Sequence, residues 1–269
     1  MCPVAWSAVP FNRTRSRVAR MKVSVITAVF NAAHTIEETL LSVAQQTHRE
    51  VEHVVMDGAS SDATQEVIAR HRDKVAKFVS EPDHGIYDAM NKGVMLATGD
   101  VIGFLNADDV YASKDVLSQV VGIMERESLD ALFGDVEFFN AKNPARTVRR
   151  YRSGRFNPDQ IALGWMPAHP ALFLRRHVYE NYGLFRTDYR IAGDFEYCAR
   201  IFHGNTLVYR SLSETLVRMR TGGVSTSGWR NTLLLNREVL RACRENGIDT
   251  NIIKIFSKYP AKLLEFLVK

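Results

Sequence analysis

Two adjacent carboxylates, Asp108 and Asp109, come two residues after an apolar run at residues 101–105, in the segment 106–109 (NADD). A short apolar run is typical of a buried strand, and the carboxyl ends of parallel strands line the ligand crevice of α/β proteins. Carboxylate oxygens suit Mg²⁺ or Mn²⁺, which bind through one or two carboxylates together with substrate phosphates. Taken alone, however, an Asp-Asp pair is more often a turn or a helix cap.

Two further polar segments follow predicted strands. Residues 57–62 (DGASSD) come after a run at 51–56, and residues 83–93 come after a run at 78–80. A carboxylate there can accept a hydrogen bond from a base edge, and free N–H groups ahead of a helix suit anionic ligands. A plain Asx turn with a helix cap would use the same residue types.

The clearest amphipathic pattern covers residues 86–97, where apolar positions recur at helical spacing. Its stripe consists of Ile86, Ala89, Met90, Gly93, Val94 and Ala97. Asp88, Asn91 and Lys92 are predicted on the opposite face, where Asp88 and Lys92 could also form an exposed ion pair four residues apart.

Strands and helices are predicted to alternate around these segments. Apolar runs predict strands at 23–27, 51–56, 78–80, 101–105 and 131–139, and a further helix at 113–127. Two polar pairs with helix-start spacing lie between them: Thr35 with Glu38, a capping box, and Asp62 with Gln65. This alternation predicts an α/β fold with a mostly parallel central sheet covered by helices on both faces. The loops after residues 27, 56, 80 and 105 should share one crevice.

From about residue 140 the pattern changes to arginine-rich loops and shorter elements. Strands are predicted at 171–174 and 206–209, and a helix at 229–243. Residues 252–269 interleave apolar residues with four lysines, which is typical either of an interfacial helix or of a helix packed on the protein's own core. Residues 1–20 are predicted to be a poorly ordered basic extension.

Composition limits the class of protein. The formal net charge is +5, and arginines gather at residues 13–20 and 146–155, which permits anionic partners. No nucleic-acid recognition motif accompanies them, so nucleic acid is not an expected partner. No run of about 18 apolar residues predicts a membrane-spanning helix. The three cysteines are far apart, which favours a reducing cytoplasm.

In their order and spacing these motifs resemble glycosyltransferase family 2, in particular the bacterial members that build surface polysaccharides and glycolipids. The segments that carry the resemblance are residues 23–31 (VSVITAVFN), 57–62 (DGASSD), 85–93 (GIYDAMNKG), 97–100 (ATGD) and 106–109 (NADD). Farther along, residues 183–188 (GLFRTD) and 191–196 (IAGDFE) resemble the acceptor-side segment of the family. The match covers about residues 21–225.

The resemblance implies a GT-A fold, a single nucleotide-binding domain with a nucleotide-sugar half at 21–140 and an acceptor half at 141–225, followed by a helical segment at 226–269. Asp108 would bind Mn²⁺ or Mg²⁺ as part of a DXD-type motif, with Asp109 beside it as the weaker candidate. The residues that the resemblance places at the donor are Ala28, Phe30, Asn31, Asp57, Gly58, Asp83, Asn91, Asp108, Arg218 and Arg220. The last two begin a segment, 218–225, that resembles a flexible loop closing over the donor's diphosphate.

Asp194 would be the general base that inverting transfer needs to take the proton of an acceptor hydroxyl. As an isolated residue it would cap the helix that follows it. Trp165, His169 and Glu196 would lie on the acceptor side.

The expected activity is therefore an inverting, metal-dependent, non-processive transfer of a sugar to a hydroxyl of a glycan or lipid-linked acceptor. A UDP-sugar is the first choice of donor, and a GDP- or dTDP-sugar is the second. We expect a cytoplasmic location, with peripheral contact at the inner face of an anionic membrane. A nucleotidyltransferase and a catalytically silent nucleotide-sugar-binding protein of the same fold remain as alternatives.

Overall fold

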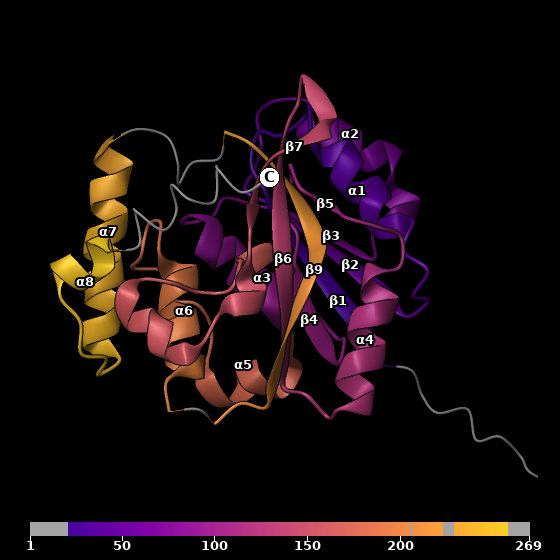
Figure 1. The fold of residues 1–269 in the computed structure, drawn as a ribbon. Coiled ribbons are helices and arrows are strands. Elements are labelled where there is room, and N and C mark those ends of the chain that lie inside the picture. Colours follow the sequence, from indigo (N-terminus) through magenta and orange to yellow (C-terminus); the bar gives the residue numbers. More distant parts are fainter. Residues whose placement is uncertain (1–20, 205, 223–228, 258–269) are drawn as a thin grey trace, which may run out of the picture.

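Four apolar runs in the first half of the chain form the parallel part of one sheet. They are β1 (Val23–Val29), β2 (Val51–Asp57), β3 (Lys77–Ser80) and β4 (Val101–Phe104). The computed structural model describes residues 21–204, 206–222 and 229–257 (Figure 1). In the strand order β3-β2-β1-β4, the chain adds β2 and β3 on one side of β1 and then returns to add β4 on the other side. The point at which the strand order switches therefore lies between β1 and β4. A ligand crevice is expected at the carboxyl ends of strands beside such a switch point.

Helices cover both faces of this sheet, as the alternating pattern predicts. One face carries α1 (Ile36–Ala44), α2 (Thr64–Arg70) and α4 (Val116–Arg126), and the other carries α3 (Ile86–Leu96) (Figure 1). The approach of α3 is close at Gly93, where an added Cβ would lie 2.4 Å from Cγ2 of Ile26. The α/β class is confirmed.

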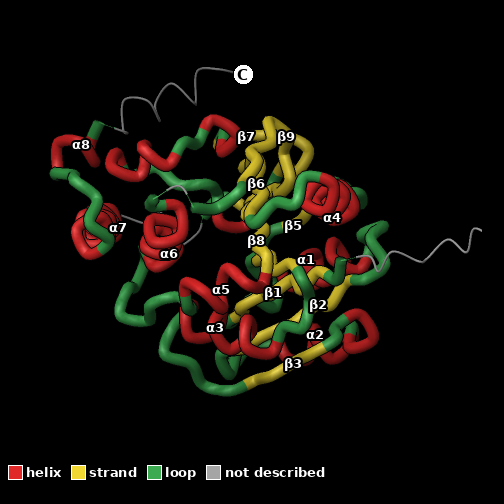
Figure 2. Tube along the Cα trace, turned by 90° about the horizontal axis from the view of Figure 1, so that it is seen from below, coloured by secondary structure: helices red, strands yellow, loops and turns green. Residues whose placement is uncertain are grey.

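The second half of the chain extends the sheet with mixed pairing. Its strands are β5 (Val110–Tyr111), β6 (Ala131–Asn140), β7 (Asn143–Tyr151), β8 (Leu172–Arg175) and β9 (Tyr209–Arg220). Strand β8 joins β4 to β6 through antiparallel pairs, while β9 runs parallel to β6. The sheet continues as one curved band from β3 to β7 and β9 (Figure 2).

Four more helices follow in the part of the chain that the structure describes. They are α5 (Arg176–Tyr182), α6 (Gly193–Phe202), α7 (Trp229–Glu245) and α8 (Ile252–Phe256). Helix α7 packs on the outside of α6, and α8 packs against α7 (Figure 1). Short 3-10 turns lie at Arg72–Lys74, Ser153–Arg155, Pro158–Leu163 and His169–Ala171. In the described ranges no helix is long and apolar enough to cross a membrane.

Several sequence predictions are wrong in detail. Thr35 precedes α1 but its side chain makes no capping bond, so the predicted capping box does not form. Ile86 begins the predicted buried stripe of α3, yet it is 47% exposed, because it stands at the first residue of the helix. Asn91, predicted on the polar face, is buried.

The strand predicted at 206–209 begins only at Tyr209 and continues to Arg220, so Arg218 and Arg220 belong to a strand and not to a loop. The basic stretch at 146–155 forms most of β7, which was not predicted as a strand. The predicted extension at 1–20, part of the predicted closing loop and residues 258–269 of the predicted interfacial helix lie outside the described residues.

Candidate active site

The loops after β1, β2 and β3 contact one another at the carboxyl ends of their strands, where the sequence predicts a shared crevice. An added Cβ at Gly58 would lie 2.5 Å from Asp83 Oδ2 and 3.4 Å from Phe30 Cδ2. Gly58 thus leaves room for two side chains from neighbouring loops. The Phe30 ring is 64% exposed there, which is unusual for a large aromatic residue and leaves one face open to a planar ligand.

Asn31 fastens the loop after β1 to the loop after β2. Its backbone N–H donates to Ser60 Oγ at 2.8 Å, and its side-chain oxygen accepts from the N–H of Ser61 at 2.9 Å. Both loops contain a non-glycine residue in the left-handed region, Asn31 with φ 50° and Ala59 with φ 58°. Such strained conformations concentrate at ligand sites, where the surrounding structure must hold them.

Asp57, which is expected at the donor, also binds neighbouring groups of the protein. Its carboxylate accepts hydrogen bonds from Ser60 Oγ at 2.5 Å and Ser80 Oγ at 2.6 Å, and it also accepts from the N–H of Ser60 at 3.1 Å. The side chain is 2% exposed. In this conformation Asp57 therefore links the carboxyl end of β2 to the carboxyl end of β3.

The two carboxylates after β4 differ in their surroundings. Asp109 is buried and accepts from Asn106 Nδ2 at 2.8 Å and from the N–H of Arg220 at 3.2 Å. Burial, and then the charge of Asp108, raise the pKa of Asp109 to about 8. Asp108 is partly exposed, and its side chain has no hydrogen bond to another of the described residues. Burial also raises the pKa of Asp108.

This difference selects Asp108 as the carboxylate that can accept an incoming cation. The described residues contain no group of three or more His, Cys, Asp or Glu side chains that could hold a metal by themselves. A site with one available carboxylate fits Mg²⁺ or Mn²⁺, because these ions complete their shells with water and substrate phosphates. It would not fit a structural zinc ion, which needs four protein ligands.

Of the two arginines predicted to contact a diphosphate, Arg220 lies beside these carboxylates. Its backbone binds Asp109, and its guanidinium pairs with Glu38 of α1 at 2.7 Å. The Nε atom of Arg220 is buried without a hydrogen-bond partner among the described residues. Arg218 lies two residues earlier in β9, where its guanidinium covers the Phe139 ring at 4.9 Å and donates to the carbonyl oxygen of Pro144.

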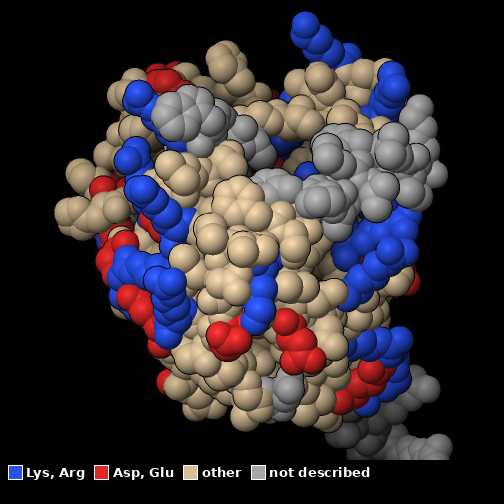
Figure 3. All heavy atoms as spheres, turned by 60° about the vertical axis from the view of Figure 1, so that its left-hand side comes forward, with Lys and Arg blue, Asp and Glu red and all other residues tan. Residues whose placement is uncertain are grey.

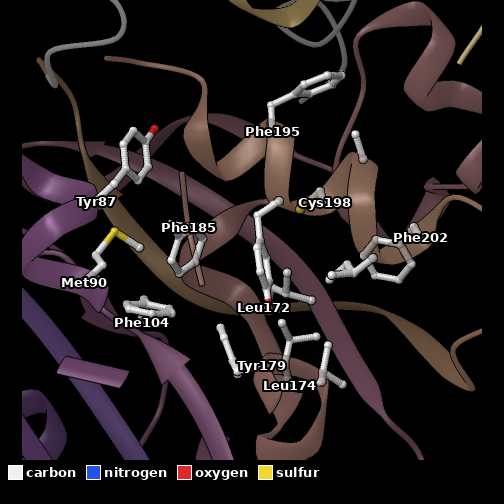
Figure 4. Close-up of a cluster of buried hydrophobic side chains, with 14 of the residues drawn as sticks. Tyr87, Met90, Phe104, Leu172, Leu174, Tyr179, Phe185, Phe195, Cys198 and Phe202 are labelled. Carbon is white, nitrogen blue, oxygen red and sulfur yellow. The ribbon is translucent and has the colours of Figure 1, made fainter. Parts of the chain in front are cut away.

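A row of rings connects the end of β4 with the loop before α6 (Figure 4). The ring centroid of Phe104 lies 4.9 Å from that of His169 and 5.5 Å from that of Phe185, which in turn lies 6.1 Å from Tyr87. Burial lowers the pKa of His169 to about 4, so its ring is neutral at pH 7. Its Nε2 is buried without a hydrogen-bond partner among the described residues, so one polar atom of this ring is unsatisfied.

Asp194 stands at the far end of this row, at the second residue of α6. Its Oδ1 accepts from the N–H of Phe195 at 2.8 Å and from the Tyr87 hydroxyl at 3.3 Å. Ala192, and not Asp194, holds the N-cap position of the helix, and the Asp194 carboxylate instead binds one free N–H of the first turn, that of Phe195. Burial raises the pKa of Asp194 to about 6 although both hydrogen bonds oppose the shift. A carboxylate with such a pKa is a competent base near neutral pH.

The position before Asp194, Gly193, has no room for a side chain. An added Cβ there would lie 2.7 Å from the ring of Tyr87, whose hydroxyl also donates to the carbonyl oxygen of Ile191 at 2.7 Å. Tyr87 was not singled out from the sequence. It follows Ile86 in an ordinary helical pattern, and its partners lie more than 100 residues away.

Three other predicted site residues are engaged structurally. The Asn91 amide both donates to the carbonyl oxygen of Phe185 and accepts from its N–H, at 2.8 and 2.9 Å. Glu196 is 2% exposed and pairs with Arg200 at 2.8 Å, so its carboxylate cannot meet an acceptor in this conformation. Trp165 stacks on Tyr151 at 5.9 Å, at the edge of the acceptor half.

The family model described as Glycosyl transferase family 2 matches residues 24–183, which contain the crevice loops and the Asp108-Asp109 pair. The chain belongs to glycosyltransferase family 2. A PGL/p-HBAD biosynthesis glycosyltransferase of Mycobacterium bovis is 31% identical over 209 residues, covering 76% of this chain and 79% of that protein. An uncharacterized glycosyltransferase of Mycobacterium tuberculosis is 30% identical over 194 residues, covering 66% of this chain and 68% of its own. The family-2 chain is therefore a glycosyltransferase.

Solved structures agree on the fold. S. aureus TarS 1-349 in complex with UDP-GlcNAc superposes with a TM-score of 0.66 at 20% identity, covering 82% of this chain and 66% of TarS 1-349. The mannosyltransferase PcManGT from Pyrobaculum calidifontis, in complex with GDP-Man and Mn²⁺, superposes with a TM-score of 0.61 at 21% identity, covering 83% of this chain and 65% of PcManGT. The family-2 chain thus spans slightly less than two thirds of each of these structures, and it shares their GT-A fold.

Proposed function

We propose that this glycosyltransferase performs an inverting, metal-dependent, non-processive transfer of a sugar from a nucleotide-sugar donor to a hydroxyl of a glycan or lipid-linked acceptor. The observation that carries the proposal is the environment of Asp194. It is a largely buried carboxylate at the second residue of α6, it shares the single Tyr87 hydroxyl hydrogen with the carbonyl oxygen of Ile191, and its pKa is raised to about 6.

The donor would bind along the loops after β1 to β4. The exposed Phe30 ring would offer a stacking surface for the base beside Gly58 and Asp83, and Ala28 and Asn31 would contribute from the same loop. Arg220 would turn from Glu38 to the diphosphate, since both are anionic partners of a guanidinium and Glu38 is exposed. Arg218 would serve less directly, because its guanidinium donates to the carbonyl oxygen of Pro144.

Asp108 would hold the divalent cation together with the donor's phosphates, and Asp109 would keep the turn in place. When bound, the cation would neutralise charge that develops on the departing nucleoside diphosphate. The assignment is supported by the availability of the Asp108 oxygens and by the two hydrogen bonds that engage Asp109. Mn²⁺ in the PcManGT complex makes this ion a reasonable first choice for trials.

On the acceptor side, Asp194 would take the proton from the attacking hydroxyl as its oxygen bonds to the anomeric carbon and the nucleoside diphosphate leaves on the opposite side. The neutral His169 would orient that hydroxyl or its neighbour through Nε2. Attack opposite to the leaving group inverts the anomeric configuration. The two buried groups would also exclude bulk water from the reacting oxygen.

A role in surface polysaccharide or glycolipid synthesis is supported by the mycobacterial relative named for PGL/p-HBAD biosynthesis. UDP-sugars remain the first choice of donor and GDP- or dTDP-sugars the second, in keeping with UDP-GlcNAc bound to TarS and GDP-Man bound to PcManGT. Work at the inner face of the cytoplasmic membrane would bring the protein to a lipid-linked acceptor.

A thermal-shift panel of nucleotide sugars tests this proposal. A ligand at 100 times its Kd stabilises the folded state by about 2.7 kcal/mol, which raises the Tm of a chain of this size by several degrees. One donor should raise the Tm in the presence of Mn²⁺, and EDTA should abolish the shift. If no nucleotide sugar raises the Tm, or if EDTA leaves the shift unchanged, the proposal is wrong.

A further inference from the structure

Glu238 in the middle of α7 binds the backbone just ahead of Asp194. Its Oε1 accepts from the N–H of Arg190 at 2.9 Å. Its Oε2 accepts from the N–H groups of Ile191 at 2.9 Å and Ala192 at 2.8 Å. Three consecutive backbone donors therefore converge on one carboxylate that is 8% exposed.

The segment ahead of Asp194 is also bound by Tyr87 of α3. The carbonyl oxygen of Ile191 accepts from the Tyr87 hydroxyl, so the residue is bound by α7 through its N–H and by α3 through its carbonyl group. Gly193 then packs against the Tyr87 ring and leads directly to Asp194. The position of the Asp194 carboxylate is thus fixed by two residues that are far from it in sequence, Tyr87 and Glu238.

A separate set of side chains anchors α7 to the same segment. Glu245 accepts from Arg186 at 2.7 Å and from the Tyr189 hydroxyl at 2.6 Å, and Arg241 pairs with both Asp188 and Glu245. On the face that carries α7, basic and acidic side chains accordingly lie next to one another (Figure 3). This anchor binds side chains of residues 186–189, whereas Glu238 binds the backbone of residues 190–192.

We propose that Glu238 is a positioning residue for the Asp194 base, so that α7 contributes to catalysis through this one side chain while the rest of the helix covers α6. The inference rests on the proposed role of Asp194. A full carboxylate suits the task because each oxygen accepts from N–H groups, while an amide would turn an NH2 group toward at least one donor. The buried Glu238 carboxylate acts on Asp194 together with two other titratable groups, the Tyr87 hydroxyl of α3 and the Cys198 thiol of α6.

The test compares Glu238→Gln with Glu245→Gln, which removes the other α7 carboxylate. Titration of Asp194 is followed by NMR of protein labelled at the aspartate carboxyl carbons, with Asp194→Asn identifying the resonance. Exchange of the amide hydrogens of residues 190–192 is measured in parallel. Glu238→Gln should lower the pKa of Asp194, since the negative charge of Glu238 raises it. It should also speed amide exchange at 190–192 by at least about tenfold, since three hydrogen bonds are weakened.

Turnover is then measured as nucleoside diphosphate release from the nucleotide sugar that most stabilises the wild type. Glu238→Gln should lower kcat by roughly 100-fold, the usual effect of misplacing a reacting group by about 1 Å, with the donor KM nearly unchanged. Glu245→Gln should lower the Tm and leave kcat and the Asp194 titration as they are. Equal behaviour of the two variants, or an unchanged Asp194 titration in Glu238→Gln, would overturn the inference.

Asp194→Asn in the same assay separates this inference from the proposed function. Full activity in Asp194→Asn would show that Asp194 is not the base, and Glu238 could then not be a positioning residue for it. An inactive Asp194→Asn beside a fully active Glu238→Gln would overturn the positioning role alone.

Discussion

At the scale of single residues, the site separates carboxylates that are engaged from those that are available. Asp57, Asp109 and Glu196 each bind groups of the protein itself. Asp108 is partly exposed without such a partner among the described residues, and Asp194 has one oxygen, Oδ2, that accepts no hydrogen bond from them. The sequence resemblance places all five at the site, and the hydrogen bonds show which of their carboxylates are already engaged within the described residues.

Asp194→Asn should therefore abolish chemistry without affecting donor binding. The amide keeps the shape of the side chain but removes the basic oxygen, so kcat should fall by about 100-fold or more. Calorimetric donor affinity and the Tm should hardly change, and both serve as internal controls. A variant that keeps more than about a tenth of wild-type turnover would contradict the assignment of the base.

The pH dependence of turnover follows from the same residue. Asp194 acts only when ionised, and burial raises its pKa to about 6, so kcat should rise with pH through this value and level off above it. A stopped assay between pH 4.5 and 8 with a saturating donor measures this limb. A limb with its midpoint near 4, the ordinary value of an aspartate, would mean that a more exposed carboxylate is the base.

At the scale of elements, burial decides what the sequence could predict. Strands β1, β2 and β4 and helix α3 lie in the core, so their apolar patterns are strong and their predicted bounds agree within a few residues. Strand β7 is exposed along most of its length and pairs only with β6 among the described strands, so its arginine-rich sequence carries no apolar signal. The contacts of Tyr87 and Glu238 are non-local and leave no pattern in the sequence.

The close contact between α3 and β1 gives a stability prediction. Gly93→Ala would place a methyl group against the fully buried Ile26, and such overpacking costs about 1–3 kcal/mol, which lowers the Tm of a chain of this size by several degrees. Gly122→Ala is the matched control, since the same methyl group on α4 meets nothing within 4 Å. Alanine should stabilise that helix by about 0.5–1 kcal/mol. Calorimetric unfolding of both variants checks the pair, and a Gly93→Ala protein as stable as Gly122→Ala would refute the close contact.

At the scale of the whole molecule, the end of the described chain is the expected membrane contact. Ile253 is 78% exposed and Phe256 is 46% exposed on α8, beside Lys254. An apolar surface flanked by cations suits an anionic bilayer. Helix α8 packs against α7 and the 3-10 turn Pro158–Leu163, and α7 packs against α6 (Figure 1).

Replacing Ile253 and Phe256 by serine should weaken binding to phosphatidylglycerol liposomes by roughly tenfold or more, since burying each side chain contributes about 1.5–3 kcal/mol. Val148→Ser is the control, because Val148 is also exposed but lies on β7. Co-sedimentation measures the difference. Unchanged binding in the double variant, and in a chain that lacks residues 250–269, would show that this segment packs on the protein and not on lipid.

Titration calorimetry of the stabilising nucleotide sugar with Asp108→Asn tests the central claim most directly. Wild-type protein and Asp194→Asn should bind this donor equally in Mn²⁺, and both should lose binding in EDTA. Asp108→Asn should bind it at least about 100-fold more weakly, because the diphosphate loses the cation that offsets its charge. Asp73→Asn, an exposed aspartate paired with Lys74, should behave as the wild type. Equal affinity in Asp108→Asn and wild type, with and without EDTA, would contradict the account.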